Sequence, residues 1–207
     1  MTTRAVTRVH AKAVFGRRVR VLATHIAGLL PSGARVLDVG CGDGSVAALV
    51  MQARPDVAIR GIDVLVRPAT KIPVEPFDGA RIPAADQSFD AVTFVDVLHH
   101  THDPTVLLSE ARRVAKTAIV IKDHLADGLL ARPTLRFMDW VGNAGHGVAL
   151  PYNYWASDRW SEAFRELGLR VDMAIRDVGL YPAPASWLFD RSLHVIWRLS
   201  RTESAAR

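Results

Sequence analysis

Val-Leu-Asp-Val-Gly-Cys-Gly-Asp-Gly, residues Val36 to Gly44, is the most informative stretch of this chain. An apolar run ends at Asp38, glycines follow at alternate positions, and an alanine-rich segment continues from Ser45 to Ala53. Because glycine lacks a Cβ atom, it tolerates positive φ and lets the backbone approach a ligand closely at a helix N-terminus. The stretch therefore predicts a strand, a tight turn and a helix that together border a binding site.

A second acidic residue ends the next predicted strand, which runs from Ala58 to Asp63. A carboxylate at this distance beyond a glycine-rich turn can accept hydrogen bonds from both hydroxyls of a ribose. The two motifs together indicate a ligand that contains a nucleoside.

The Asp-x-Gly-x-Gly-x-Gly form of the loop resembles motif I of class I S-adenosylmethionine-dependent methyltransferases. Further matches follow in the family's order: Gly61-Ile62-Asp63, Phe77-Asp78-Gly79, residues 86–92 and Val97-Leu98-His99-His100. The later matches are similar to the small-molecule subgroup that includes the ubiquinone and menaquinone biosynthesis enzymes. That subgroup usually has a Lys-Pro-Gly-Gly turn before its fifth strand, which this chain lacks.

By this resemblance S-adenosylmethionine is the cofactor. Asp38 would accept from its amino group, Asp63 from the ribose hydroxyls and Asp78 from the adenine amine, while the N–H of Gly79 would serve a ring nitrogen. Carboxylates near a sulfonium also favour this cofactor over NAD. The residues assigned to the cofactor site are Asp38, Gly40, Cys41, Gly42, Asp63, Val64, Asp78, Gly79 and Val95.

The fold implied is α/β: a Rossmann-like, doubly wound seven-stranded sheet, mostly parallel with an antiparallel last strand, and with helices between its first five strands. We expect a single domain over residues 1–207, of a size that buries its own core. Its parts are an N-terminal helical segment (1–33), a cofactor-binding half (34–122), a lid over the acceptor (123–156) and a segment that completes the sheet (157–207).

Composition limits the classes of protein to which the chain can belong. Apolar residues make up 49% and charged residues 23%, which is ordinary for a globular protein. The single cysteine, Cys41, excludes an intramolecular disulfide and a multi-cysteine metal site, and no metal site is expected. With no signal peptide or long apolar run apparent, we expect a cytoplasmic protein.

The N-terminal segment from 4 to 30 has apolar residues at helical spacing among arginines. It predicts a helix, with a break allowed near Gly16. Three interpretations stay open: packing on the sheet, a lid over the site, and a basic face that touches a membrane.

Residues 125–156 are predicted to be irregular, because they contain several glycines and prolines. Long connections of this kind often bind ligands. The candidate acceptor-binding residues are Trp140, Asn143, Tyr152, Tyr154 and Trp155. A surface loop anchored by core aromatics is the alternative.

Methyl transfer needs a general base only if the acceptor must lose a proton. The candidate bases are His99, His100, His124 and His146, which Asp123 or Asp139 could orient. A packing role for the first two histidines stays open, as does the methylated atom, which can be oxygen, nitrogen or carbon.

Rival functions are weighed by the motifs that they require. Methyltransferases of base amino groups usually carry Asn/Asp-Pro-Pro-aromatic after the fourth strand, where this chain has Asp96-Val97-Leu98-His99-His100. The net charge of +5 is only weak support for nucleic acid. A nicotinamide oxidoreductase and a non-catalytic interaction protein on the same fold are further alternatives. Within the enzyme reading, a soluble metabolite and a quinone or lipid drawn from a membrane both stay possible.

Overall fold

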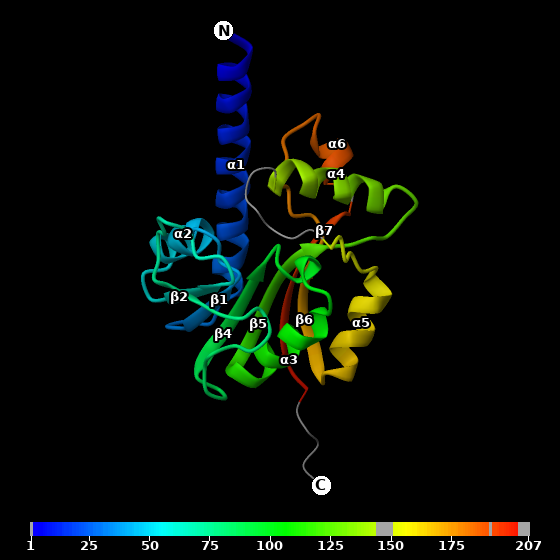
Figure 1. The fold of residues 1–207 in the computed structure, drawn as a ribbon. Helices are drawn as coiled ribbons and strands as arrows, with labels where there is room; N and C mark the ends of the chain where they lie inside the picture. Colours follow the sequence, from blue (N-terminus) through cyan, green and yellow to red (C-terminus); the bar gives the residue numbers. More distant parts are fainter. Residues whose placement is uncertain (1, 144–150, 191, 203–207) are drawn as a thin grey trace.

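The computed structural model describes residues 2–143, 151–190 and 192–202, with side chains from residue 16 onward and not at 142 and 143 (Figure 1). The helices are α1 (Thr2–Leu29), α2 (Ser45–Ala53), η1 (Leu98–His100), α3 (Pro104–Val114), α4 (Ala131–Asn143), α5 (Ser157–Glu166) and α6 (Ser186–Phe189). The strands are β1 (Arg35–Val39), β2 (Ala58–Asp63), β3 (Val74–Pro76), β4 (Phe89–Val95), β5 (Ala115–His124), β6 (Leu169–Ile175) and β7 (His194–Arg201).

The strands form one seven-stranded sheet in the order β3-β2-β1-β4-β5-β7-β6. Strands β1 to β5 are parallel, and β7 runs antiparallel to both of its neighbours, β5 and β6. The predicted fold class is therefore confirmed, including the antiparallel last strand. Strand order reverses between β1 and β4, which places a ligand crevice at the carboxyl ends of these strands.

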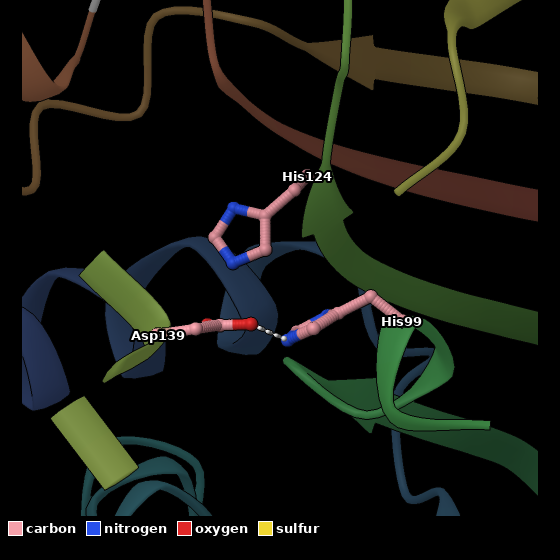
Figure 2. Close-up of side chains that lie close together, drawn as sticks. All are labelled: His99, His124 and Asp139. Carbon is pink, nitrogen blue, oxygen red and sulfur yellow. Dashed lines mark ion pairs between the residues drawn. The ribbon is translucent and has the colours of Figure 1, made fainter. Parts of the chain in front are cut away.

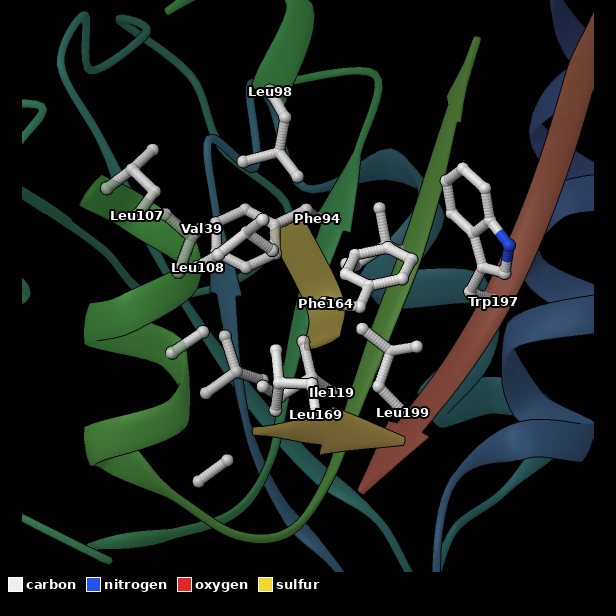
Figure 3. Packing of buried hydrophobic residues seen from close by; sticks show 14 of the residues in the cluster. Val39, Phe94, Leu98, Leu107, Leu108, Ile119, Phe164, Leu169, Trp197 and Leu199 are labelled. Carbon is white, nitrogen blue, oxygen red and sulfur yellow. The ribbon is translucent and has the colours of Figure 1, made fainter. Parts of the chain in front are cut away.

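Helices cover both faces of the sheet. Because successive side chains of a strand point to opposite faces, Val36 belongs to the core beneath α1 and α2, whereas Leu37 belongs to the core beneath α3 and α5. Figure 3 shows the latter core, where Phe94 of β4 and Phe164 of α5 lie among buried leucines. The two cores fix the strands whose ends carry the site.

Helix α1 runs through Gly16, so the break that the sequence allowed there does not occur. Glycine inside a helix costs only about 1 kcal/mol relative to alanine. The C-terminal part of α1 buries Leu22 and Ile26 in the core, while its N-terminal part extends beyond the sheet in Figure 1. None of the helices in the described ranges combines the length and the apolar character that a membrane span requires.

Two expectations about connections need correction. No helix joins β2 to β3 or β3 to β4 within the fully described residues 64–88, which contain several prolines. Residues 125–156 are not irregular throughout, because α4 lies within them. Its Pro133 is tolerated in the first turn, where backbone N–H groups have no partner within the helix. Leu135 anchors α4 by packing against Tyr154.

Two boundaries of α3 follow from local features of the sequence. Asp103 caps α3, since its Oδ1 accepts the N–H of Thr105 at 2.9 Å. Strand β5 begins at Ala115, immediately after α3, so the missing Lys-Pro-Gly-Gly turn leaves no gap between helix and strand.

Replacing Trp160 with Ala should lower the free energy of unfolding by about 3–5 kcal/mol, because the side chain is 1% exposed and its removal leaves a cavity in the core. Urea denaturation measures this change. The matched control is Trp187→Ala, at a side chain that is 75% exposed, which we expect to change stability by less than about 0.5 kcal/mol. Equal effects of the two substitutions would contradict the packing described above.

Candidate functional site

The glycine-rich loop lies between β1 and α2 and needs glycine for steric reasons. Gly40 and Gly44 have φ of 72° and 73°. A Cβ atom on Gly40 would lie 2.6 Å from Cγ2 of Val97, and one on Gly44 would lie 2.5 Å from Cγ1 of Ile72. The loop is thus held against the segment after β4 on one side and the segment after β2 on the other.

Asp63 links the end of β2 to this loop. Its Oδ2 accepts the N–H of Gly42 and its Oδ1 accepts the N–H of Leu65, both at 2.8 Å. Each carboxylate oxygen has a second lone pair, so the group keeps acceptor capacity for a ligand. This is the position at which the sequence predicts ribose binding.

Asp38 lies below the loop and is 4% exposed. Burial raises the pKa of its carboxyl to about 7, and a hydrogen bond from the Thr93 hydroxyl at 2.7 Å only partly opposes that effect. A cationic ligand nearby would favour the ionised form.

Asp78 lies at an open cavity of about 460 Å³ beyond β3, lined by residues that include Phe77 and Arg81. Its Oδ1 accepts the N–H groups of Ala80 and Arg81, which lower the pKa of the carboxyl. Gly79 has φ of 82°. This is the cavity beside which the sequence predicts adenine binding.

The remaining cofactor candidates are less polar. Val64 is 64% exposed, and a Cβ atom on Gly79 would lie 3.0 Å from its Cγ1. Val95 is half-buried at the end of β4. Cys41 packs so closely over Gly61 that a Cβ there would lie 2.2 Å from its Sγ, and burial raises the pKa of the thiol. Cys41 is therefore a packing group rather than a reactive thiolate.

A second cavity, of about 130 Å³, lies beyond the carboxyl ends of β4 and β5. It is lined mainly by polar and charged side chains from widely separated segments: Arg18, Asp96, His99, His100, His124, Met138, Asp139 and Tyr181. Three of the predicted general bases therefore lie at one cavity. His146 lies outside the described residues.

Asp96 is the anionic centre of one side of this cavity. It forms ion pairs with Arg18 of α1 and Lys122 of β5, and Nε2 of His124 lies 3.4 Å from its Oδ1. Burial opposes ionisation of Asp96, but Arg18 and Lys122 together hold the pKa of this carboxyl well below its usual range. Its φ of 58° is uncommon for a non-glycine residue.

His99 lies between two carboxylates on the other side. Its Nδ1 is 2.7 Å from Oδ1 of Asp123. Its Nε2 is 3.4 Å from Oδ2 of Asp139, the ion pair drawn in Figure 2. Burial opposes protonation, yet Asp123 and Asp139 raise the pKa of His99 to about 10. At neutral pH this ring is an imidazolium. Asp123 and Asp139, which the sequence analysis proposed as partners of a histidine, thus both contact His99.

His100 and His124 are neutral by contrast. Burial lowers the pKa of His100, and the charge of His99, whose ring centroid is 4.1 Å away, lowers it further. Burial likewise lowers the pKa of His124, with Lys122 adding to the effect. The cavity thus combines one charged and two uncharged imidazoles.

The predicted acceptor-binding residues do not gather at one place. The hydroxyl of Tyr154 donates to Asp139, which brings this residue to the cavity wall. Tyr152 contacts Tyr154, with ring centroids 6.3 Å apart. Trp155 packs instead on Trp160 in the core, with ring centroids 4.9 Å apart.

Two further candidates lie on α4. Trp140 is 62% exposed, and the side chain of Asn143 is outside the described part of the chain.

Sequence reasoning missed four residues that line the cavity and the buried lysine that pairs with one of them. The four are Arg18, Asp96, Met138 and Tyr181, and the lysine is Lys122, the partner of Asp96. A signal existed for Lys122, because a lysine that directly follows Ile119-Val120-Ile121 in a buried strand is expected to have a charged partner. No comparable signal marks Arg18, which lies among other arginines of α1.

Comparison with known proteins shows the family to which the chain belongs. The family model described as "Methyltransferase domain" matches residues 11–173. The 27-O-demethylrifamycin SV methyltransferase of Amycolatopsis mediterranei is 30% identical over 185 residues, which cover 80% of this chain and 65% of the relative. The ubiquinone/menaquinone biosynthesis C-methyltransferase of Desulfotalea psychrophila is 33% identical over 95 residues, covering 42% of this chain and 39% of the relative.

Similarity to a solved structure supports the fold. The complex between the Haloferax volcanii Trm112 methyltransferase activator and a methyltransferase contains a chain with a TM-score of 0.66 and 17% identity, covering 93% of both chains. The chain spans less than two thirds of the length of these two sequence relatives, 65% of the first and 39% of the second.

The raised pKa of Asp38 should make the stability of the protein fall as the pH rises. Because its pKa is about 7 in the folded protein and about 3.9 in an unfolded chain, the folded state binds the extra proton between these values, and stability falls as pH rises. Between pH 5 and 8 the wild type should lose about 2–3 kcal/mol relative to Asp38→Asn. Urea denaturation of both proteins across this range measures the difference, and parallel pH profiles would contradict the raised pKa.

Proposed function

The chain belongs to the methyltransferase domain family, and from this premise we propose that it transfers a methyl group from S-adenosylmethionine to a small-molecule acceptor. The observation that carries the proposal is that the acidic strand ends beside the glycine loop and the histidine-lined cavity lie at the same edge of the sheet. Asp38 and Asp63 lie at the ends of β1 and β2, and the histidine-lined cavity lies beyond the ends of β4 and β5.

The residues around the glycine loop fit the cofactor. A Cβ atom on Gly42 would meet no atom within 4 Å, so the backbone there is open to a ligand, and the carboxylate of Asp63 accepts the N–H of this same residue. Asp38 would accept from the amino group, Asp63 from the ribose and Asp78 from the adenine. The cofactor, when bound, supplies an electrophilic methyl group on a sulfonium.

The cavity beyond β4 and β5 would hold the acceptor. An acceptor with a hydroxyl must lose a proton as the methyl is transferred, and a neutral imidazole within reach can take it. His100 is the best candidate, because it is neutral, lines the cavity and is only half-buried. His99 already carries a proton, and Nε2 of His124 faces Asp96.

The acceptor class is a small molecule with an ionisable hydroxyl. The 27-O-demethylrifamycin activity named for one relative agrees with this class, whereas the relative from quinone biosynthesis is named as a C-methyltransferase. A quinone drawn from a membrane is a second candidate, favoured by apolar side chains exposed on α4, α6 and the segment before α4: Leu129, Leu130, Phe137, Trp140, Trp187 and Leu188. Assays of water-soluble phenols against lipid-embedded quinones separate the two.

Replacing Asp63 with Ala should weaken S-adenosylmethionine binding by about 1.5–3 kcal/mol, because hydrogen bonds between a charged group and the ribose are lost. Isothermal titration calorimetry measures the affinity. The control is Asp56→Ala, which removes an acid that pairs with Arg54 away from the loop and should leave the affinity unchanged. An unaltered affinity in the Asp63 variant would exclude this residue from the site.

Replacing His100 with Ala should lower kcat about 100-fold or more, because a positioned general base typically contributes at least that factor. S-adenosylhomocysteine formation is followed with a panel of phenols, hydroxyquinones and amines as acceptors. Affinity for S-adenosylmethionine should not change. The control, His102→Ala, alters an exposed histidine two residues along the chain and should keep full activity. Full activity of the His100 variant would rule out the assigned role.

A further inference from the structure

Three side chains from three separate elements converge beside the acceptor cavity. His99 of η1, His124 of β5 and Asp139 of α4 are all buried, and one ligand atom of each lies within 4.8 Å of the other two. Figure 2 shows the His124 ring facing the space between His99 and Asp139. Two imidazoles and a carboxylate form a donor set that binds divalent transition metals.

The spacing of two of these donors suits a metal better than a hydrogen bond. Nε2 of His99 is buried without a hydrogen-bond partner among the described residues, although Oδ2 of Asp139 lies 3.4 Å away. Two ligands that bind a tetrahedral zinc ion at about 2.0–2.1 Å are themselves about 3.4 Å apart. An ion between these atoms would give Nε2 of His99 a partner, while Oδ2 of Asp139 keeps the hydrogen bond from the Tyr154 hydroxyl.

The groups behind the donors are arranged as in metal centres. Asp123 accepts at Nδ1 of His99, which fixes the ring with Nε2 directed at Asp139. Histidine ligands commonly have a carboxylate at their second nitrogen, because it orients the ring and strengthens the donor. The Tyr154 hydroxyl holds Asp139 in a similar way.

The local charges also admit a cation. The carboxylates of Asp123 and Asp139 both lie beside the ring of His99, so the space next to these groups has a negative potential. The nearby cations Arg18 and Lys122 both form ion pairs with Asp96.

We propose that His99, His124 and Asp139 bind one divalent transition-metal ion of the zinc class. The cavity of about 130 Å³ that these residues line leaves a further coordination position open, as in catalytic rather than structural zinc sites. Binding of the ion rests on these side chains alone. Its role, which rests on the proposed function, is to hold the acceptor oxygen and lower the pKa of its hydroxyl.

The test uses the full, tag-free chain after treatment with a chelator and its removal. Titration with Co²⁺ is followed by visible ligand-field absorption, and Zn²⁺ is then added as a competitor. We expect one Co²⁺ per chain, displaced by Zn²⁺. His124→Ala and Asp139→Asn should each lower the affinity at least about 100-fold, since even partners behind metal ligands contribute 10–100-fold.

His102→Ala is the matched control, because it removes an exposed histidine and should bind Co²⁺ like the wild type. Binding of S-adenosylhomocysteine, measured on every variant, checks that the fold is intact and tests the cofactor proposal separately from the metal. The metal site would be overturned if the folded wild type failed to bind one Co²⁺. It would also be overturned if the Asp139→Asn and His124→Ala variants bound Co²⁺ with the affinity of the wild type.

Discussion

The charge of Asp96, whose side chain is only 18% exposed, is the constraint on which the cavity beyond β4 and β5 depends. A carboxylate taken out of water must be paired, because an unpaired buried charge costs several kcal/mol. Here the partners are Lys122, on the adjacent strand, and Arg18, from the N-terminal helix. The pairing therefore does more than neutralise a charge. It ties α1 to the ends of β4 and β5 and makes a helix outside the sheet part of the cavity wall.

The three histidines of this cavity differ in charge because their surroundings differ. His99 has a carboxylate near each ring nitrogen and holds a positive charge, whereas His100 and His124 lose theirs through burial beside other cations. Such divergence between neighbouring titratable groups is typical of sites that move protons. An acceptor hydroxyl in the cavity would meet a cationic group that favours its anion and a neutral imidazole able to take its proton.

The first strands and the glycine turn could be predicted from the sequence because their signals are local. Gly40 directly follows β1, Asp63 ends β2 and Asp78 lies two residues after β3, so strand periodicity and turn chemistry locate them. The acceptor side depends on contacts between distant segments: Arg18 and Asp96 are 78 positions apart, and Lys122 and His194 are 72 apart. Helix α4 was missed because Pro133 and nearby glycines indicated a loop. Its Asp139 was recognised as a histidine partner, but its place beside His99 and His124 depends on how α4 packs.

The contact between Gly40 and Val97 has a consequence for how such a protein can change. Val97 fills the space where Gly40 has no side chain, and it lies one residue after Asp96 and two before His99. The glycine loop and the segment that carries the histidines are therefore packed together through this contact, so neither can shift without the other. Helix α4 is held by a separate small cluster of Ala131, Leu135, Tyr154 and Leu193. Substitutions in this cluster can therefore change the α4 side of the cavity while the glycine loop and the segment that carries the histidines keep their contact.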